Sequence, residues 1–401
     1  MKTILPLLKS LFPPSCHNRV VIVGGTVRDL LIDRESRDID LVTALSHDEL
    51  LALGFRLVEA VSASTIYFKH HPQFGNIEAT RIGSMADLES DLRRRDFTIN
   101  AMVLDLSGTL IDPLGGAEDL KKRMLRACSA ETFTADPLRI FRAFRFETDG
   151  WIMTPETAEL ITEEDWSAAF STIPVERFSN EMLKALSGKM PERFFQRMIM
   201  FGTGEQILPE LFRMPTIPAG PLQYHPEGDL FSHSIQALQR VAAVSDDPLA
   251  RFCAFFHDLG KLATNSALYP KHHGHDETGF AMAPEFCKRL RLPITYAKGL
   301  AGVSRLHGKA NKWDELRDAT KIRMAWQAFK DGIVDILPLV SAADKAGGPP
   351  MTGWNIAVRV AEMSTLELGI DQKQLETMPV KNRAPFILQK RAEAMKHLIS
   401  V

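Results

Sequence analysis

Residues 20–42 read VVIVGGTVRDLLIDRESRDIDLV, a strand pattern followed by two glycines, a helical pattern and a second strand pattern. Runs rich in β-branched residues predict the strands, and the apolar spacing after the glycines predicts the helix. Because glycine has no Cβ, backbone N–H groups at such a strand-to-helix turn can approach phosphate oxygens. Gly24 and Gly25 are therefore predicted to bind nucleotide phosphates, and Arg28, in the first turn of the helix, adds a charged guanidinium fork.

The two aspartates that close this stretch occur at period two. Asp38 and Asp40 alternate with Ile39 and Leu41, and residues i and i+2 of a strand lie on one face. Two neighbouring carboxylates repel each other unless a cation lies between them, and Mg²⁺ held by carboxylates and substrate phosphates is the usual solution. Such a pair positions the ion for attack of a hydroxyl on a nucleotide α-phosphate. Either half alone is more often a tight turn or a solvated strand face, but the combined spacing favours the functional interpretation.

The composition is typical of a globular protein with several domains. The chain has 401 residues, of which 45% are hydrophobic and 24% charged. This length predicts about two to four domains. The net charge of -2 indicates no global basic field, although a local basic groove for nucleic acid is compatible with it.

Cysteine usage and the N-terminal stretch bear on the compartment. The scattered cysteines argue against a disulfide framework or a thiolate zinc site and are typical of a reducing cytoplasm. In MKTILPLLKSLFPP a proline and a lysine interrupt the apolar run, so we expect a short helix or arm there. No segment has the apolar length of a membrane span. The four cysteines are Cys16, Cys128, Cys253 and Cys287.

Strand patterns give way to helical ones along the chain. Residues 20–125 mix the two, and after residue 136 apolar residues recur at helical spacing. Residues 213–229, RMPTIPAGPLQYHPEGD, are rich in Pro and Gly and are predicted to form a linker. The pattern predicts an α+β fold, a small mixed-sheet head followed by an all-α neck and body and a further all-α domain. The expected segments are an N-terminal arm (1–19), the head (20–134), a helical neck and body (135–215), a second helical domain (220–346) and a helical tail (347–401).

Several motifs together resemble one known family. GGTVRD and RDIDLV are followed by RRRDFTINAMVLD (93–105), IDPLGGAEDLKKRMLR (111–126) and ADPLRIFRAFRF (135–146). The series resembles the polymerase β-type nucleotidyltransferases, and specifically the bacterial CCA-adding tRNA nucleotidyltransferase and poly(A) polymerase branch. The resemblance implies a nucleotidyltransferase head that uses Mg²⁺, with tRNA, CTP and ATP as partners and no membrane.

The resemblance also implies roles for residues within these motifs. Asp136 and Arg139 match the pair that the family uses as a protein template for the base edge of CTP or ATP. Helix neighbours at i and i+3 can present a carboxylate acceptor and guanidinium donors side by side. Without the motif context, an intrahelical ion pair would be the favoured interpretation. The positions that match family contacts to the incoming nucleotide are Arg95, Asp96, Arg139 and Arg142.

Three features depart from the family pattern. Ala135 stands where the base-reading helix usually begins with a glutamate, which alters part of the base-reading network. The segment GSMADLESDLRR between Arg81 and Arg95 is short and resembles specialised enzymes that stop after CC, so CC addition is an alternative to CCA addition. Residues 54–71 lack the basic G-R-R-F-R-type stretch that poly(A) polymerases of this branch tend to carry, which disfavours polyadenylation.

A second set of potential metal ligands lies in the C-terminal half. His and Asp are borderline to hard ligands that suit a divalent metal. Consecutive residues of a helix point apart, so the HD pair in AFFHDLGK can share a metal only near an interrupted helix end, which the following Gly-Lys favours. KHHGHDETG (271–279) and His307 add further histidines. The H…HD…D series comprises His233, His257, Asp258 and Asp344.

This series resembles the HD phosphohydrolase superfamily. The runs YHPEGDLFSHSIQAL and HHGHDETG resemble the HD domain attached to CCA enzymes of the enterobacterial type. The resemblance implies metal-dependent 2′,3′-cyclic phosphodiesterase, 2′-nucleotidase and phosphatase activities, with Ni²⁺ or Mn²⁺ as alternatives to Mg²⁺ at this site. The competing interpretation is a degenerate HD fold retained for helix packing or RNA positioning.

Three function classes remain open on the sequence alone. The first is a tRNA transferase that completes CCA or stops at CC, and the second is an HD hydrolase with a vestigial head. Intact Asp38, Asp40 and Arg28 argue against the second class. The third, a non-enzymatic RNA-binding protein, accounts for neither set of potential metal ligands. The sequence defines no oligomeric state, and residues 347–401 carry no functional motif.

Overall fold

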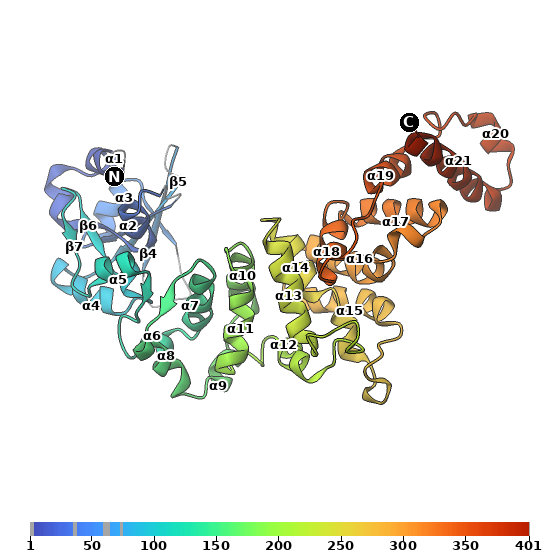
Figure 1. Cartoon of the computed structure of the whole chain (residues 1–401). Coiled ribbons are helices and arrows are strands. Elements are labelled where there is room, and N and C mark those ends of the chain that lie inside the picture. The colour runs from blue at the N-terminus through green and yellow to red at the C-terminus, as the bar shows by residue number, and fades with distance from the viewer. Residues whose placement is uncertain (1–3, 35–37, 59–64, 73–74, 401) are drawn as a thin grey trace. The chain divides into compact units, whose positions relative to one another are not determined.

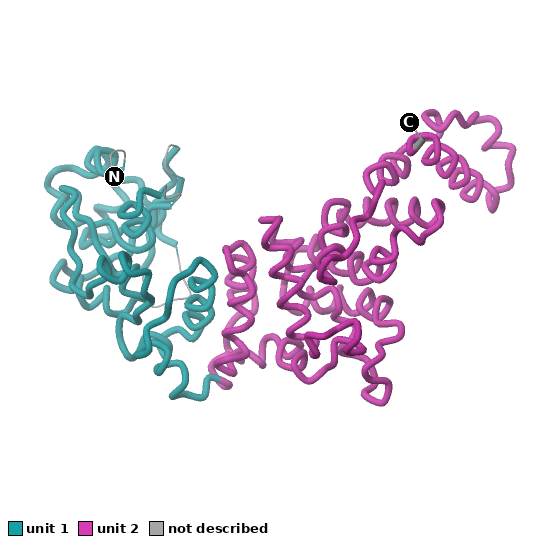
Figure 2. Tube along the Cα trace, in the orientation of Figure 1, with its two compact units in different colours: residues 1–166 teal, residues 167–401 magenta. Residues whose placement is uncertain are grey.

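The computed structural model describes residues 4–34, 38–58, 65–72 and 75–400. Contacts between Cα atoms divide the chain into two compact units, residues 1–166 and residues 167–401 (Figure 2). The first unit holds the sheet and the second is helical, which confirms the predicted α+β class. The contact boundary groups the first helices after residue 134 with the sheet, and the five-part division stays a prediction.

Unit 1, residues 1–166, is built on a mixed β-sheet. In the described part of the chain, seven strands pair in the order β3-β4-β5-β2-β1-β6-β7. Strands β2 and β5 are parallel, and the other pairs are antiparallel. The strands are β1 (Val20–Val23), β2 (Asp38–Thr43), β3 (Arg56–Val58), β4 (Ile66–His71), β5 (Gly75–Arg81), β6 (Val103–Asp105) and β7 (Leu110–Ile111).

Helices surround this sheet (Figure 1). Helix α2 follows β1 directly, because a positive φ of 71° at Gly24 turns the chain from extended to helical geometry. A core cluster joins the sheet to helix α4 through Val21, Val42, Leu92 and Val103. The elements are α1 (Ile4–Leu11), α2 (Gly24–Leu31), α3 (His47–Ala52), α4 (Leu88–Arg93), α5 (Gly116–Lys122), α6 (Thr132–Ala135), α7 (Leu138–Thr148) and α8 (Pro155–Thr162), with a small parallel pair β8 (Met124–Leu125) and β9 (Ile152–Met153).

The N-terminal segment packs onto this unit. Helix α1 buries Ile4 and Leu8, and Phe12 beyond it is also buried. The Phe12 ring stacks on Phe55 with 6.0 Å between centroids. The segment therefore contributes apolar surface to the head, as well as forming the short helix that the sequence indicated.

Unit 2, residues 167–401, consists of helices and 3₁₀ turns. Aromatic residues fill its centre, where the ring of Phe195 stacks on that of Phe255 with 3.9 Å between centroids. The helices are α9 (Ser167–Ser171), α10 (Val175–Leu186), α11 (Glu192–Phe201), α12 (Pro209–Arg213), α13 (Leu230–Ala242), α14 (Pro248–Phe256), α15 (His275–Arg289), α16 (Ile294–Ala310), α17 (Asp318–Asp331), α18 (Ile336–Asp344), α19 (Trp354–Glu362), α20 (Gln372–Thr377) and α21 (Val380–Ser400).

Residues 213–229 differ from the linker that their composition predicted. Met214 and Ala219 are fully buried, and Pro218 forms an isolated β-bridge with Asp229. The segment is thus a tightly packed loop within unit 2. Pro and Gly mark turns for conformational reasons, and that preference is the same in a solvated linker and in a packed loop.

Two further expectations concern cysteines and membranes. The four cysteines are free and buried. Among the helices of the described residues, none is both long enough and apolar enough to span a lipid bilayer.

Gly116 provides a test of packing in unit 1. A Cβ added there would lie 2.2 Å from the Thr98 carbonyl oxygen, so we expect Gly116→Ala to lower the free energy of unfolding by about 3 kcal/mol. Gly115 has a φ of +75° and no atom within 4 Å of an added Cβ, so Gly115→Ala should lose only about 1 kcal/mol. Urea unfolding followed by tryptophan fluorescence measures both, and equal losses would contradict the close approach.

Candidate active site and metal centre

The diglycine bend lies against the carboxylate strand. An added Cβ at Gly24 would be 2.9 Å from Asp40 Oδ2 and 3.5 Å from a guanidinium nitrogen of Arg95. Thr26 Oγ1 of α2 accepts a hydrogen bond from the Asp40 amide at 3.1 Å and donates to the Asp38 carbonyl at 3.0 Å. The start of α2 and the acidic end of β2 are therefore fixed to each other, as the sequence spacing suggested.

A third carboxylate shares the face of Asp38 and Asp40. In the parallel pairing of β2 with β5, Asp40 is the register partner of Glu78. Register partners on adjacent strands point to the same face of a sheet, while Ile39 between the aspartates is fully buried on the other face. Sequence reasoning missed Glu78, because one acidic residue in IEATR has no motif and only strand pairing brings it to the site.

The electrostatics of this face favour a cation. Burial raises the pKa of Asp40, and the negative charge of Asp38 raises it further. Arg95 and Arg142 lower it, but the net shift is upward. Burial also raises the pKa of Glu78, with further contributions from Asp40 and Asp38. A raised carboxyl pKa marks an anion that lacks sufficient positive partners. Oxygen ligands in this state fit a hard divalent cation such as Mg²⁺.

Asp96 organises two of the arginines near this face. Its side chain is buried and accepts hydrogen bonds from Arg142 Nη1 at 2.9 Å and Asn100 Nδ2 at 3.0 Å. Asn100 Oδ1 in turn accepts from Arg28 Nη1 at 2.7 Å. Burial would raise the pKa of Asp96, but Arg142 and Asn100 hold it below the usual value. Asp96 thus orients both guanidinium groups, and its own contact with nucleotide stays a prediction.

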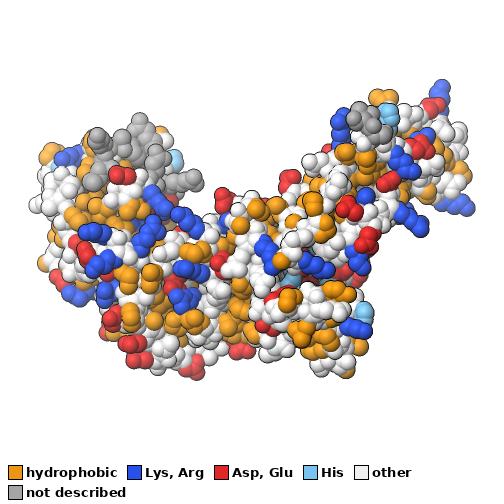
Figure 3. Space-filling view, viewed as in Figure 1, with side chains coloured by type: hydrophobic (Ala, Val, Ile, Leu, Met, Phe, Trp, Pro, Cys, Tyr) orange, Lys and Arg blue, Asp and Glu red, His pale blue; other side chains and the backbone are white. Residues whose placement is uncertain are grey.

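A basic cavity lies beside these groups in unit 1. Its volume is about 980 Å³, and five of its lining residues are arginines. Figure 3 shows Lys and Arg side chains gathered on the face of this unit that it presents. A smaller cavity of about 310 Å³ shares Ala135 and Arg139 with it. Such a surface suits a polyphosphate. The cavity arginines are Arg81, Arg94, Arg95, Arg139 and Arg142.

Backbone carbonyls hold the guanidinium of Arg139. Ala135 has no carboxylate to orient it, and carbonyl oxygens can do so without adding a charge. The backbone oxygen of Asp136 accepts from the Arg139 amide at 3.0 Å, so a turn connects the two predicted base-reading residues. Asp136 itself is extended, with φ -153° and ψ 98°, and lies before α7, so the two residues are not the helix neighbours that the sequence indicated. Nη1 and Nη2 of Arg139 donate to the carbonyl oxygens of Arg94 (2.8 Å), Arg95 (3.3 Å) and Thr132 (3.1 Å).

The H…HD…D residues form one buried cluster in unit 2. One potential ligand atom from each lies within 4.8 Å of the others. His233 Nε2 is 3.0 Å from Asp344 Oδ1, and His257 Nε2 is 3.2 Å from Asp258 Oδ2. All four side chains are buried. Helix α13 supplies the first histidine, the end of α14 supplies the HD pair and the end of α18 supplies Asp344.

A helix interruption lets the consecutive HD pair converge. Helix α14 ends at Phe256, and His257 and Asp258 lie between it and a 3₁₀ turn, Leu259–Ala263. Gly260 in this turn approaches α15 so closely that an added Cβ would lie 2.1 Å from the His275 carbonyl oxygen. The Gly in HDLGK is therefore required for packing, because any side chain there would collide with the backbone of α15.

The cluster has strong internal electrostatics. Burial would lower the pKa of His257, but Asp258 and Asp344 raise it to about 10. Burial would raise the pKa of Asp258, but Lys261 and His257 hold it well below its usual range. Neither Asp258 oxygen has a well-formed hydrogen bond, although Lys261 Nζ lies 2.6 Å from Oδ2. Buried histidine and carboxylate ligand atoms that converge in this way fit a divalent cation.

Glu227 orients the first histidine of the cluster. Its Oε1 lies 2.7 Å from His233 Nδ1 and 3.0 Å from His225 Nδ1. A carboxylate can only accept, so Nδ1 of His233 carries the proton and Nε2 is directed at the cluster. Burial would raise the pKa of Glu227, but the hydrogen bond from His233 outweighs this effect and the pKa falls to about 2. Sequence analysis missed Glu227, and the signal was its spacing of six residues before His233.

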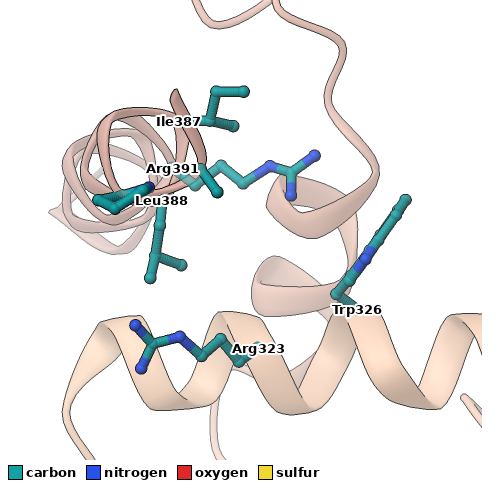
Figure 4. Close-up of a pocket in the computed structure, with 7 residues that line it drawn as sticks. Arg323, Trp326, Ile387, Leu388 and Arg391 are labelled. Atoms are coloured by element: carbon teal, nitrogen blue, oxygen red, sulfur yellow. The ribbon is translucent and has the colours of Figure 1, made fainter. Parts of the chain in front are cut away.

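A further cavity lies in the C-terminal helices, where no motif was found. It measures about 420 Å³ and lies between α17 and α21 (Figure 4). Trp326 forms one wall, and the guanidinium carbon of Arg391 lies 5.2 Å from its ring centroid. None of the described residues that line this cavity is a histidine or an acid, so it has no metal-binding character.

Together, a carboxylate-bearing strand beside an arginine-lined cavity and a buried His/Asp cluster define a nucleotidyltransferase-type head joined to an HD-type helical domain. Family models match both parts. The Poly A polymerase head domain matches residues 61–126, the probable RNA and SrmB-binding site of polymerase A matches residues 152–214, and the HD domain matches residues 230–345.

Curated relatives extend the likeness along the chain. The multifunctional CCA protein of Mannheimia succiniciproducens is 31% identical over 418 residues, which cover 94% of this chain and 99% of that protein. Those of Nitrosococcus oceani and Shewanella denitrificans are 35% and 32% identical, each over 76% of this chain and 78% of the relative. The chain belongs to the CCA-adding enzyme family, among the multifunctional CCA proteins that carry an HD domain.

Solved structures share the fold. A Thermotoga maritima CCA-adding enzyme complexed with tRNA has a TM-score of 0.66 at 20% identity, covering 100% of this chain and 96% of that chain. A Bacillus stearothermophilus CCA-adding enzyme in complex with CTP has a TM-score of 0.61 at 22% identity, covering 95% and 88%.

The raised pKa of Asp40 has a consequence for stability. The folded chain disfavours ionised Asp40, so ionisation of this residue lowers the stability of the folded state. This loss of stability is absent below the pKa of Asp40 in the unfolded chain and develops as the pH rises through its pKa in the folded chain. In EDTA, Asp40→Asn should therefore raise the melting temperature by about 2–4 °C at neutral pH and leave it unchanged near pH 3. The exposed Asp48→Asn is the control, and a melting temperature lowered at neutral pH would contradict the assignment.

Proposed function

We propose that this chain adds CCA to the 3′ end of tRNA from CTP and ATP, and that its HD domain hydrolyses phosphoesters. The observation that carries the transferase proposal is the acidic face formed by Asp38, Asp40 and Glu78, adjoining Gly24. The cavity arginines beside it supply positive charge for a triphosphate. We place the reaction in the cytoplasm, which the four free cysteines support.

The chemistry is a displacement at phosphorus. The tRNA 3′-oxygen bonds to the nucleotide α-phosphorus, the bond from that phosphorus to the bridging oxygen breaks, pyrophosphate leaves, and the hydroxyl proton passes to a carboxylate of the acidic face. Asp38 and Asp40 would hold Mg²⁺, which neutralises developing charge when bound. The N-terminal end of α2 and Arg28 bind the triphosphate, and Arg95 and Arg142 fix its position. Positioning and charge stabilisation carry the rate, so no covalent intermediate is needed.

Base selection falls to Asp136 and Arg139. A carboxylate acceptor and guanidinium donors complement the edges of cytosine and adenine. The three carbonyl oxygens that hold Arg139 fix the direction of its remaining donors. This arrangement supports base reading without the glutamate that Ala135 replaces.

The RNA partner follows from charge and from the relatives. The solved Thermotoga maritima enzyme is bound to tRNA, and the Bacillus stearothermophilus enzyme is bound to CTP. Phosphate contacts would hold the acceptor arm through shape and charge, because A-form RNA exposes little base sequence to side chains.

CC addition is the second candidate product. The segment between β5 and the RRD motif is short, and α4 within it buries Leu88 and Leu92 in the head. A segment anchored by two core side chains has little freedom to switch the cavity from CTP to ATP. The full-length likeness to multifunctional CCA proteins supports CCA addition.

Product length separates these candidates. We expect tRNA that lacks its 3′ end to gain three nucleotides with labelled CTP and ATP together, read on a sequencing gel. Two nucleotides would indicate CC addition, and a long ladder with ATP alone would indicate a poly(A) polymerase.

Asp38→Ala tests the transferase site directly. We expect a loss of at least about 10²-fold in nucleotide addition, because the substitution removes a ligand of the charge-stabilising cation. Circular dichroism should show an unchanged fold, and Asp48→Ala, at an exposed position of α3, should retain full activity. Full transfer by the Asp38 variant would refute the assignment.

His257→Ala tests the HD proposal independently. The buried His/Asp cluster supports a divalent cation, with Mg²⁺, Mn²⁺ and Ni²⁺ as the candidates. We expect hydrolysis of a 2′,3′-cyclic nucleotide to fall at least about 100-fold with each of these ions while CCA addition continues. The exposed His273→Ala is the matched control. Hydrolysis undiminished by His257→Ala would leave the HD domain a packing or RNA-positioning element.

A further inference from the structure

The cavity between α17 and α21 has the size and the lining of a ligand site. Its volume of about 420 Å³ lies within the range of roughly 300–1,000 Å³ that small-molecule pockets occupy. Figure 4 shows the side chains of Arg323, Trp326 and Arg391 around this space. Among the described residues that line the cavity, none belongs to the predicted transferase site or to the His/Asp cluster. The cavity is therefore a third candidate site, apart from the other two.

The indole of Trp326 forms a fixed wall of the cavity. Its ring stacks on that of Phe329 with 5.7 Å between centroids, and Lys330 Nζ lies 5.0 Å from the indole centroid. The guanidinium carbon of Arg391 lies 5.2 Å from the same centroid, so a cation of α21 is held against an aromatic ring of α17. Because these contacts already order the indole and the guanidinium, binding a ligand there costs less conformational entropy.

The guanidinium of Arg391 is only partly satisfied by the protein. Nη2 donates to the Met363 carbonyl oxygen at 3.2 Å, while Nε is buried and has no hydrogen-bond partner among the described residues. Burial lowers the pKa of Arg391, because the charged form loses hydration. A cation that is partly removed from water without a matching anion favours an anionic ligand.

The two helices that line the cavity carry a surplus of positive charge. Together they contain eight Lys or Arg residues and three acids. Glu393 is paired with Lys390 at 2.8 Å, and Asp331 accepts from the Gln327 amide at 2.8 Å, so these two acids have partners elsewhere. No described residue that lines the cavity is acidic. The local charge thus favours an anion, although the whole chain has a net charge of -2.

We propose that this cavity binds a small organic phosphate such as a nucleoside monophosphate. Arg323 and Arg391 would contact the phosphate from the two helices, because guanidinium forks bind phosphate oxygens in pairs and two forks can share three terminal oxygens. A carboxylate, or a phosphodiester within RNA, presents only two free oxygens and is the poorer match. Apolar walls accommodate the organic part of the ligand. These walls are formed by Trp326, Ile387 and Leu388.

Fluorine NMR of the full-length chain labelled with 5-fluorotryptophan tests this site without reference to transfer or hydrolysis. The chain has five tryptophans, and the resonance that Trp326→Phe removes is that of Trp326. We expect AMP to shift this resonance saturably, and inorganic phosphate to do so far more weakly. Arg391→Gln should weaken AMP binding at least about 10-fold, because it removes a charge-assisted hydrogen bond. Lys396→Gln is the matched control, since it removes an exposed cation of α21 outside the cavity and should bind AMP normally.

Several results would overturn the proposal. A Trp326 resonance that AMP does not shift would do so, as would equal AMP affinity in the parent and in Arg391→Gln. Inorganic phosphate or octanoate as effective as AMP would show that the site does not select an organic phosphate. A shift with tRNA and none with AMP would assign the cavity to RNA instead. If circular dichroism shows that Arg391→Gln does not fold, the exposed Arg323→Gln replaces it, and undiminished AMP binding by that variant would overturn the proposal.

Discussion

Carboxylates that the backbone holds close together inside a protein repel one another unless positive charge offsets the repulsion, and both candidate centres depend on how that positive charge is supplied. In the head, strand register fixes Asp40 beside Glu78, and neither can move away without breaking the parallel ladder. In the helical unit, Asp258 and Asp344 are both buried, and His257 Nε2 lies 3.2 Å from an oxygen of the first and 3.5 Å from an oxygen of the second. In the head, the raised pKa values of Asp40 and Glu78 mark negative charge that a cation would stabilise. In the helical unit, Lys261 and His257 already hold the pKa of Asp258 well below its usual range.

The part of the head that could be predicted from sequence is the part encoded locally. Two glycines and a D-x-D pair lie within about twenty residues, and strand periodicity alone puts Asp38 and Asp40 on one face. Glu78 could not be found in this way, because its role arises from pairing between strands distant in sequence. The hydrogen bonds of Arg139 could not be predicted either, because its partners are backbone carbonyls, which every residue type has.

The helical unit shows the same division. The glycine that follows the HD pair indicated a helix interruption, and the structure has one, because α14 ends before the pair and a 3₁₀ turn follows it. His275 and His307 could be identified in the sequence as potential ligands, but only the packing of α15 against α16 brings them together. Glu227 was missed for a different reason, because its Pro- and Gly-rich surroundings were interpreted as a linker.

That packed segment, residues 213–229, contacts the His/Asp cluster and its neighbouring lysine at two points. It supplies Glu227 to His233, and its Ala219 carbonyl accepts from the buried Lys261 at 2.7 Å. A loop whose Glu227 side chain bonds a candidate ligand and whose Ala219 carbonyl holds a neighbouring lysine has little freedom to lengthen or shorten. We therefore expect this loop to tolerate insertions and deletions poorly, because a change in its length would displace Glu227 from His233 and the Ala219 carbonyl from Lys261.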